Sequence, residues 1–495
     1  MRVSMNQIYD SVIRNSNNSM AEIMRLTNQN SAQKTILRPS DDPLGWALAM
    51  NTRSYMERLD QYQENNDTAE SWLSLGDDVL GQCETLTTHI RELAEQAATG
   101  TLTDEQRDLV ATEAREFFEQ LMAQSNTEYA GQSIFAGTYT DDQAYEMGLA
   151  ATVMDDTLDD GLVLSVTGAA EQTPLIEFQS DGVTGVDGLN YRYSLDSGLT
   201  WTDATLAAGD TEIDLGSCRM QLAAGQTVSA PTNDASGTMI MLRPAAMYQG
   251  NGVSDALVTN LGHDPVLADA EGSFAGKTLV RIDADTTLAG TIEYSYSLDQ
   301  GQTWVTGNFA SNASLPIPGG FLNLASNAGS TLTASSQFAI SLDDPEIRLD
   351  IGPGGDSVAI NIAGCSVFGG RYETATGTEP VPGDIEDNLF ETVGQLIGYM
   401  EINDIEGIGQ CLDLLDTSHD HLATKHAQLG GRENRVTLAS ESVDMAEEAA
   451  TQRLSDIEDA DLTQVLTDLA REQTIYSAVL ETSSQIMGMS LLNYI

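Results

Sequence analysis

Three histidines stand close together late in the chain, at His419, His421 and His426 in the stretch HDHLATKH. Histidines with nearby carboxylates are common ligands of zinc and other transition metals. On a helix, residues 419 and 426 share a face because seven residues make about two turns, whereas residue 421 points elsewhere. The spacing therefore favours a solvated helix face over a metal centre, and we expect neither a metal nor a cofactor.

A second set of residues comes from an internal repeat. Tyr191–Trp201 (YRYSLDSGLTW) and Tyr294–Trp304 (YSYSLDQGQTW) match at eight of eleven positions and lie 103 residues apart. Both contain S-x-D-x-G-x-T-W, which resembles the Asp-box of sialidases and related propellers. In such a turn the aspartate binds amides, the glycine takes a positive φ and the tryptophan packs beneath. We expect β-hairpin turns without catalysis, built on Asp196, Gly198, Trp201, Asp299, Gly301 and Trp304.

The chain has no catalytic fingerprint in a fitting context. The motifs GxSxG and HExxH, the P-loop and the Rossmann glycines are missing. The acidic stretch 155–160 lacks the spacing of a calcium-binding EF-hand loop. We predict that the protein is not an enzyme. Weak binding of a glycan or calcium by the repeated segments remains an alternative.

Charge and cysteine content exclude further classes. The 495 residues contain 22 basic and 75 acidic side chains, a net charge of −53, which opposes binding to nucleic acid or anionic membranes. No apolar run is long enough to cross a membrane, and the start MRVSMNQIYD has no apolar signal core. We expect a cytoplasmic protein or one exported by another route. Cys83 and Cys411, both in GQC triplets, are either neighbours or separate core cysteines.

Helical patterns occupy both ends of the chain. A weak apolar stripe predicts a helix over 1–35, and a very long pattern follows from Leu44 to about Thr99. Thr103 is the expected cap of a third helix that ends near Asn126. Helical patterning returns at Ile385. The segment between the first two predicted helices contains two prolines, which end the first helix and suit the start of the second. It has the motif Arg38, Pro39, Ser40, Asp41, Asp42 and Pro43.

The middle of the chain has short alternating runs with turn residues about every ten positions, which is typical of β-sandwiches. The sequence therefore predicts an α+β multidomain fold, with a helical bundle or coiled coil from both chain ends and inserted all-β sandwich domains. The expected parts are an N-terminal assembly helix (1–40), a first bundle segment (41–139), the β insert (140–383, with repeat units about 150–250 and 265–350), a second bundle segment (384–453) and a C-terminal assembly helix (454–495).

The C-terminal stretch from Ser455 to Ile495 reads as one long helix with a narrow apolar stripe. Its stripe residues follow heptad spacing, which predicts pairing with another helix. Residues 1–38 hold five basic and two acidic side chains (+3), and 455–495 hold seven acidic and one basic (−6), so the two ends are complementary. The expected assembly interface comprises Val12, Ile23, Leu26, Leu462, Val465, Leu469, Tyr476, Val479 and Ile486.

Several terminal motifs resemble the bacterial flagellin superfamily, and within it the proteins of the hook–filament junction. They are the opening MRVSMNQIYD, the RPSDDP motif at 38–43, the segment SIFAGT at 133–138, the element GRENR at 431–435 and the ending from Leu454 to Ile495. Together the regions around them cover about half of the chain.

The resemblance implies a structural subunit without catalysis. Its terminal helices would be disordered in the free monomer and would pair in a ring assembly with copies of itself. It implies export through the flagellar type III apparatus to the extracellular flagellum, without a cleaved signal peptide. The implied partners are hook-associated protein 1, flagellin and an export chaperone, with no nucleic acid and no membrane insertion. A flagellin-type filament subunit is the alternative.

Overall fold

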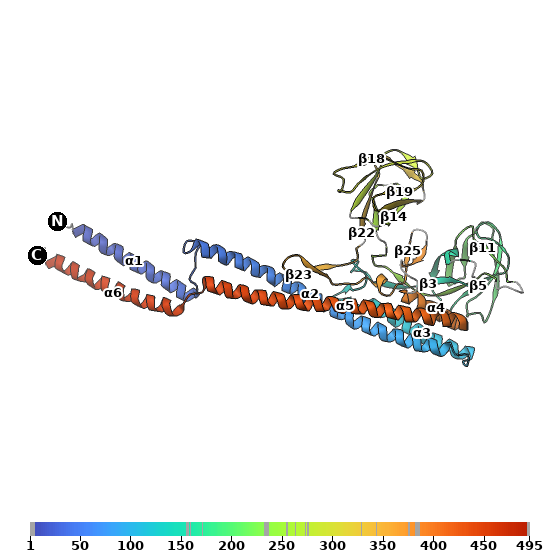
Figure 1. Cartoon of the computed structure of the whole chain (residues 1–495), viewed down its shortest axis with the longest axis horizontal. Coiled ribbons are helices and arrows are strands. Elements are labelled where there is room, and N and C mark those ends of the chain that lie inside the picture. The colour runs from blue at the N-terminus through green and yellow to red at the C-terminus, as the bar shows by residue number, and fades with distance from the viewer. Residues whose placement is uncertain are drawn as a thin grey trace. The chain divides into compact units, whose positions relative to one another are not determined.

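The structure is a computed structural model that describes residues 5–492 apart from 155–157, 159, 171, 232–236, 254–255, 263, 273, 275–276, 328, 343, 375–376 and 382–386. Within these residues, helices occupy both ends of the chain and strands fill the segment between them (Figure 1). The predicted α+β class is therefore confirmed. The helices are α1 (Met5–Ala32), α2 (Pro43–Ala97), α3 (Asp104–Ser125), α4 (Leu389–Glu401), α5 (Ile405–Glu458) and α6 (Leu462–Leu492).

Local signals explain where the first helices begin. Pro43 is the first residue of α2, where its fixed φ suits the helix and its missing N–H leaves no donor unpaired. Before α3, the Thr103 hydroxyl accepts a hydrogen bond from the amide of Gln106, and the Gln106 side chain accepts one from the amide of Thr103. This capping box fixes the start that the sequence predicts.

The long helix predicted over 455–495 starts later in the structure, because a break precedes Leu462. Helix α5 continues to Glu458, and α6 begins only at Leu462. The Asp461 carboxylate accepts hydrogen bonds from the amides of Thr463 (2.9 Å) and Gln464 (3.1 Å). An aspartate that caps the following turn stabilises a new helix start at the expense of a continuous helix.

The insert contains two units with the same strand pairings. In the first, β12 pairs with β3 and β5, β7 with β5 and β8, β10 with β4 and β9, and β11 with β6. Adding ten to each strand number gives the pairs of the second unit. The internal repeat in the sequence is thus one part of two similarly folded β units.

The first β unit comprises β3 (Tyr145–Val153), β4 (Val163–Gly168), β5 (Leu175–Phe178), β6 (Gly182–Val183), β7 (Leu189–Ser194), β8 (Thr202–Leu206), β9 (Glu212–Asp214), β10 (Cys218–Leu222), β11 (Thr227–Val228) and β12 (Met239–Tyr248). The second comprises β13 (Ala256–Asn260), β14 (Val266–Gly272), β15 (Thr278–Ile282), β16 (Thr286–Thr287), β17 (Ile292–Ser297), β18 (Val305–Ala310), β19 (Ser314–Ile317), β20 (Gly320–Ser326), β21 (Thr331–Leu332) and β22 (Gln337–Leu342).

The remaining short elements are β1 (Glu128–Tyr129), β2 (Gln132–Ser133), β23 (Arg348–Gly352), β24 (Asp356–Ala359), β25 (Arg371–Glu373), β26 (Thr378–Pro380) and the 3-10 turns η1 (Asp160–Leu162) and η2 (Gly364–Ser366).

The chain forms two compact units. Unit 1 comprises Met1–Thr68, Asp350–Ser357 and Val436–Ile495, and unit 2 comprises Ala69–Leu349 and Val358–Arg435. Within unit 2, each β unit has its own apolar core, built for example around Ile176 and Phe178 in the first and Val280 and Phe338 in the second. Among the residues that the structure describes, none of the helices combines the length and apolar character that a membrane crossing needs.

Candidate assembly surfaces

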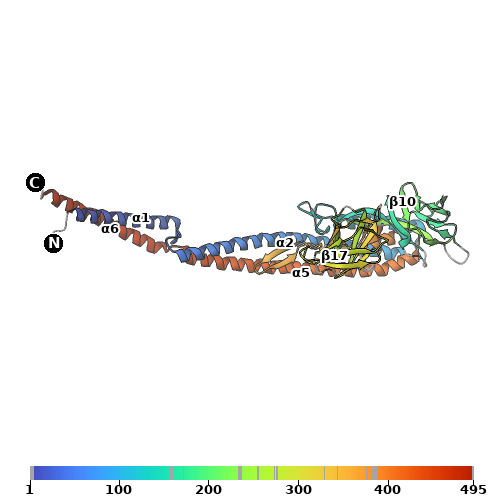
Figure 2. The same ribbon diagram turned by 90° about the horizontal axis from the view of Figure 1, so that it is seen from above.

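The two chain ends lie side by side in unit 1, where α1 packs along α6 (Figures 1 and 2). Of the nine residues predicted for the interface, Leu26 is buried, with 4% exposure. Leu462 is 37% exposed, and Ile486 lies outside the residues whose side chains the structure describes. The other six are partly buried: Val12, Ile23, Val465, Leu469, Tyr476 and Val479.

The seam between these helices is partly polar. Ser19, Gln29 and Ser483 are among its buried side chains. The pKa of the Arg25 guanidinium is raised, first by its hydrogen bond with Glu22 and further by the nearby carboxylates of Asp41 and Asp468. Because Asp468 lies on α6, charge also acts between the helices. A mixed seam of this kind gives a weaker pair than a continuous apolar zipper would.

Several large apolar side chains of the same helices remain exposed to solvent. On α1 they follow spacings of seven and four residues, which places them on one face of the helix. On α6, Leu466 and Leu480 are fourteen residues apart and also share a face. We call this set the outer stripe, and it comprises Ile13 (57% exposed), Met20 (40%), Met24 (58%), Leu466 (51%) and Leu480 (48%).

The RPSDDP motif forms the turn into α2. The Asp41 carboxylate accepts hydrogen bonds from the amides of Leu37 (3.1 Å) and Arg38 (2.9 Å), and the Asp42 carboxylate accepts one from Leu44 (3.1 Å). A Cβ at Gly45 would lie 2.5 Å from an Asp42 carboxylate oxygen and 2.6 Å from Ile36 Cδ1, so a larger residue would displace these side chains. The motif thus fixes a tight turn, while Arg38, Pro39 and Ser40 stay exposed.

Sequence reasoning missed a residue that binds basic side chains from both sides of this turn. Glu458, at the end of α5, has a side chain that is only 3% exposed. Its Oε2 accepts hydrogen bonds from Lys34 Nζ (2.8 Å) and Arg53 Nη2 (2.5 Å). Since its partners precede it by 424 and 405 residues, no local pattern could reveal them.

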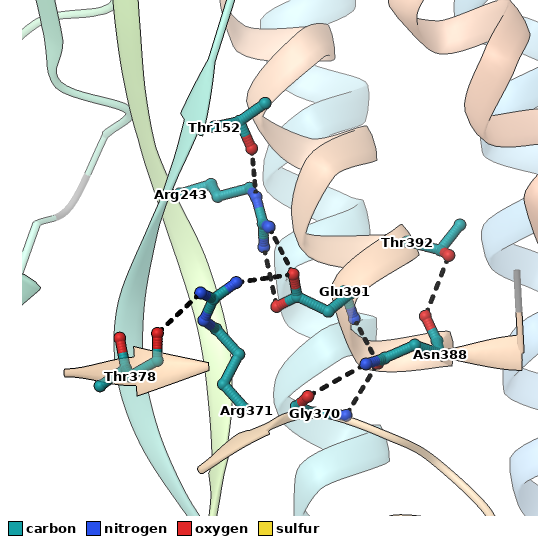
Figure 3. Close-up of polar contacts among 8 residues, drawn as sticks. All are labelled: Thr152, Arg243, Gly370, Arg371, Thr378, Asn388, Glu391 and Thr392. Atoms are coloured by element: carbon teal, nitrogen blue, oxygen red, sulfur yellow. Dashed lines mark hydrogen bonds and ion pairs between the residues drawn. The ribbon is translucent and has the colours of Figure 1, made fainter. Parts of the chain in front are cut away.

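In unit 2, a buried acid joins the helices to the first β unit (Figure 3). Glu391 on α4 accepts hydrogen bonds from Arg243 on β12 (2.7 Å to Oε2) and Arg371 on β25 (3.0 Å). Arg243 also donates to Thr152 of β3 (2.7 Å). Burial alone would raise the pKa of Glu391, but the charges of the two arginines hold it below its usual value.

Helix α4 lies unusually close to the strand beside it. A Cβ at Gly394 would stand 2.3 Å from the carbonyl oxygen of Pro244, and one at Gly398 would stand 2.7 Å from the sulfur of Met241. At the end of α4, Glu401 binds Arg115 of α3 (2.6 Å) and the amide of Thr173 (2.6 Å). These contacts fix α4 between α3 and the sheet of the first β unit.

The two repeated hairpins have the same polar contacts. In the first, the Asp196 carboxylate binds Ser194 (2.7 Å) and both the amide and the hydroxyl of Thr200. Gly198 has a φ of +94°. Arg192 covers the ring of Trp201, with its guanidinium carbon 4.5 Å from the ring centroid. This arrangement is a closed turn in which Arg192 covers one face of the tryptophan ring.

In the second hairpin, the Asp299 carboxylate binds Ser297, and Arg281 lies 4.4 Å from the centroid of Trp304. The glycine, Gly301, has a φ of +92°. Hydrogen bonds, first those from the Thr303 hydroxyl and amide, lower the pKa of Asp299 to about 2. The first hairpin shows the same, because bonds from Thr200 and Ser194 lower the pKa of Asp196 to about 2.

Replacement of Asp299 by alanine is expected to open only the second hairpin. The Asp299 carboxylate accepts a hydrogen bond from the amide of Thr303 (2.8 Å). Without it, hydrogen exchange in the peptide that contains Thr303 should become about tenfold faster. Mass spectrometry of both hairpin peptides measures this, and the Asp196 hairpin is the internal control. In the unchanged protein, the contribution of this carboxylate is complete above the pKa of an unfolded aspartate, about 3.9, so protection should decline as the pH falls from there to about 2. Equal exchange in the variant would contradict the assignment.

The three histidines do not converge. His426 lies between Asp77 (3.1 Å) and Glu84 (2.9 Å) of α2, whereas His421 contacts the carbonyl of Ser366 (2.9 Å). No group of three potential metal ligands occurs in the described part of the chain. His426 is thus a partly buried helix-packing residue, a role that differs from the expected solvated face.

The cysteines are buried and free of disulfides. Helices α2 and α5 run antiparallel, with Arg91 bound to Asp416 (2.7 Å) and Gly76 against Leu429. This register places Cys83 opposite residues near 422, about three helical turns from Cys411, so the two are not neighbours. Burial raises the pKa of both thiols to about 12.

Comparison with known proteins finds matches at both ends of the chain. Residues 3–140 match the bacterial flagellin N-terminal helical region, and residues 412–495 match the bacterial flagellin C-terminal helical region. Flagellar hook-associated protein 3 of Salmonella typhimurium is 34% identical over 142 residues, and that of Escherichia coli is 33% identical over 142 residues. Each match covers 28% of this chain and 45% of the relative, so it spans less than half of the relatives' length.

Solved structures give a more distant likeness. Flagellar hook associated protein-3 from Legionella pneumophila shows 13% identity over 82% of this chain and 98% of its own, with a TM-score of 0.32. A putative flagellar hook-associated protein from Vibrio parahaemolyticus shows 12% identity over 85% and 100%, with a TM-score of 0.37. The likeness to flagellar proteins therefore rests on the sequence matches at the termini, and not on these structures. The two ends of this chain thus match the helical regions of bacterial flagellin, the superfamily that the terminal motifs resemble.

Proposed function

We propose that the protein is a structural, non-enzymatic subunit that forms the junction between flagellar hook and filament. The observation that carries this proposal is the pairing of the two chain ends, α1 with α6, whose outer stripe remains exposed. A pair of helices that buries one face and leaves a second apolar face exposed is suited to association with further helices. The names of the curated relatives, both hook-associated protein 3, support the same position in the flagellum.

The partners and the location belong to the same proposal. The protein would assemble with copies of itself between hook-associated protein 1 and flagellin. An export chaperone and the type III export apparatus would deliver it to the extracellular flagellum. The high negative charge would keep monomers apart and soluble before assembly, because like charges repel over about 8 Å at physiological salt.

The proposal is tested by removing α6 and the residues after it. A chain that ends at Asp461 should stay folded and soluble, because the α2–α5 packing and both β units remain. It should nevertheless fail to restore filament attachment in a strain that lacks the full-length protein. Circular dichroism measures folding, and electron microscopy measures attachment. Restored attachment by the truncated chain would refute the proposal.

A filament subunit is the second candidate, because the matching family models are those of flagellin. Electron microscopy of the same deletion strain separates the two functions. Intact hooks together with filament protein shed into the medium indicate a junction protein. Hooks with filament caps, but without filament protein, indicate a filament subunit.

A further inference from the structure

The two chain ends are joined where their connectors meet in unit 1. The connector between α1 and α2 and the one between α5 and α6 exchange backbone hydrogen bonds. Ala460 N–H donates to the carbonyl of Gln33 (3.0 Å), and Thr35 N–H donates to the carbonyl of Glu458 (2.6 Å). These bonds, with the bridge between Lys34 and Asp459, form one step of an antiparallel β ladder.

An ionic cluster around a buried carboxylate lies at the same point. We call Lys34, Arg53 and Glu458 the Glu458 cluster. The Glu458 side chain is 3% exposed, whereas Lys34 and Arg53 are 41% and 35% exposed. A carboxylate so deeply buried is unfavourable unless charged partners compensate it. Each member comes from a different segment: the first connector, α2 and the end of α5.

The position of this cluster matters because the seam between α1 and α6 is weak. Polar side chains such as Ser19, Gln29 and Ser483 are buried in it, and they offer little apolar packing. The helix ends themselves are determined locally, since Gln33 has a φ of +57° and Asp461 caps α6. The connectors therefore determine where the α1–α6 pair starts relative to the α2 and α5 segments of unit 1.

We infer that Glu458 is a positioning residue that holds the α1–α6 pair to the start of α2 and the end of α5 for assembly. This inference rests on the proposed function, because it concerns how the paired ends are presented to other copies. Without the cluster, the pair could still form, but its attachment would no longer be fixed. The α1–α6 pair would then lose conformational freedom when a neighbouring copy binds the outer stripe. This loss weakens association.

The first test uses Lys34 as a reporter of the cluster. Trypsin cleaves after lysine and arginine, and Lys34 lies in the connector with its ammonium group on Glu458. In the full-length protein, Glu458→Gln should raise the rate of cleavage after Lys34 at least tenfold. Cleavage after Arg14 and Arg25, inside α1, should not change. Arg53→Gln should give a smaller increase, since Lys34 remains as a partner.

Asp456→Asn is the matched control. Asp456 is exposed, lies two residues before Glu458 and loses the same charge in the variant. It should leave cleavage after Lys34 unchanged. Unchanged cleavage in Glu458→Gln would overturn the inference. So would a parallel rise at Lys34, Arg14 and Arg25, because it would mean that Glu458 only stabilises α1.

The second test measures assembly of the same variants by sedimentation and by filament attachment. Glu458→Gln should assemble at least tenfold less than the unchanged protein, whereas Asp456→Asn should equal it. Normal assembly of Glu458→Gln would overturn the inference. If the unchanged protein itself fails to assemble, the proposed function is wrong. The rate of cleavage after Lys34 then still tests whether the Glu458 cluster fixes the connector.

Discussion

Replacement of Glu391 by glutamine is expected to lower the free energy of unfolding of unit 2 by about 3–5 kcal/mol, the usual cost of breaking a buried ion pair. The Glu391 side chain is 6% exposed and faces two arginines, of which Arg243 is fully buried. Glutamine has nearly the same shape, so the loss comes from the missing charge. Two guanidinium groups would then remain in the interior without a counter-charge.

Urea unfolding followed by circular dichroism measures this change. The matched control is Glu373→Gln, because Glu373 is an exposed acid on β25, two residues from Arg371. It should change the free energy of unfolding by less than about 0.5 kcal/mol. Equal midpoints for the two variants would show that the Glu391 charge does not stabilise the fold.

The same carboxylate gives the stability a defined pH dependence. The arginines lower the pKa of Glu391 in the folded state, so its contribution is complete above the pKa of an unfolded glutamate, about 4.3. The contribution is lost as the pH falls from there through the lower, folded pKa. The difference in stability between the unchanged protein and Glu391→Gln should therefore shrink in acid, and a constant difference would contradict this assignment.

Local signals in the sequence predicted the helices well. The proline at the start of α2 and the Thr103 capping box of α3 each act within a few residues, and both appear in the structure as expected. The Tyr191 and Tyr294 repeats likewise pointed to two β units. The match extends in the structure to all ten strands of each unit, although most of these strands show little resemblance in sequence.

The residues that sequence reasoning missed act over long separations. Arg243 and Arg371 precede Glu391 by 148 and 20 residues, and Lys34 precedes Glu458 by 424. In a chain with 75 acidic residues, no pattern separates a buried acid from an exposed one. The break between α5 and α6 was missed because no proline or glycine marks it in the sequence, whereas a single aspartate cap decides the local structure.

Replacement of outer-stripe residues is expected to weaken assembly strongly with little change in stability. Leu466 and Leu480 are 51% and 48% exposed on one face of α6. Glutamine at both positions should change the free energy of unfolding by less than about 0.5 kcal/mol each, because neither side chain is buried. In an assembly, however, each buried leucine would contribute about 1.5–3 kcal/mol, so the loss of two should weaken association more than tenfold.

Sedimentation of the assembled protein, together with its thermal unfolding, tests this expectation. Leu109→Gln is the control, since Leu109 is 71% exposed on α3 and belongs to no terminal helix. A further comparison is Leu26→Ala, in the seam that α1 and α6 already bury, which should destabilise the pair itself. If the double variant assembled as well as the unchanged protein, the outer stripe could not be the surface through which copies associate. Association would then have to use the α1–α6 seam, with the two helices separating and pairing with those of neighbouring copies.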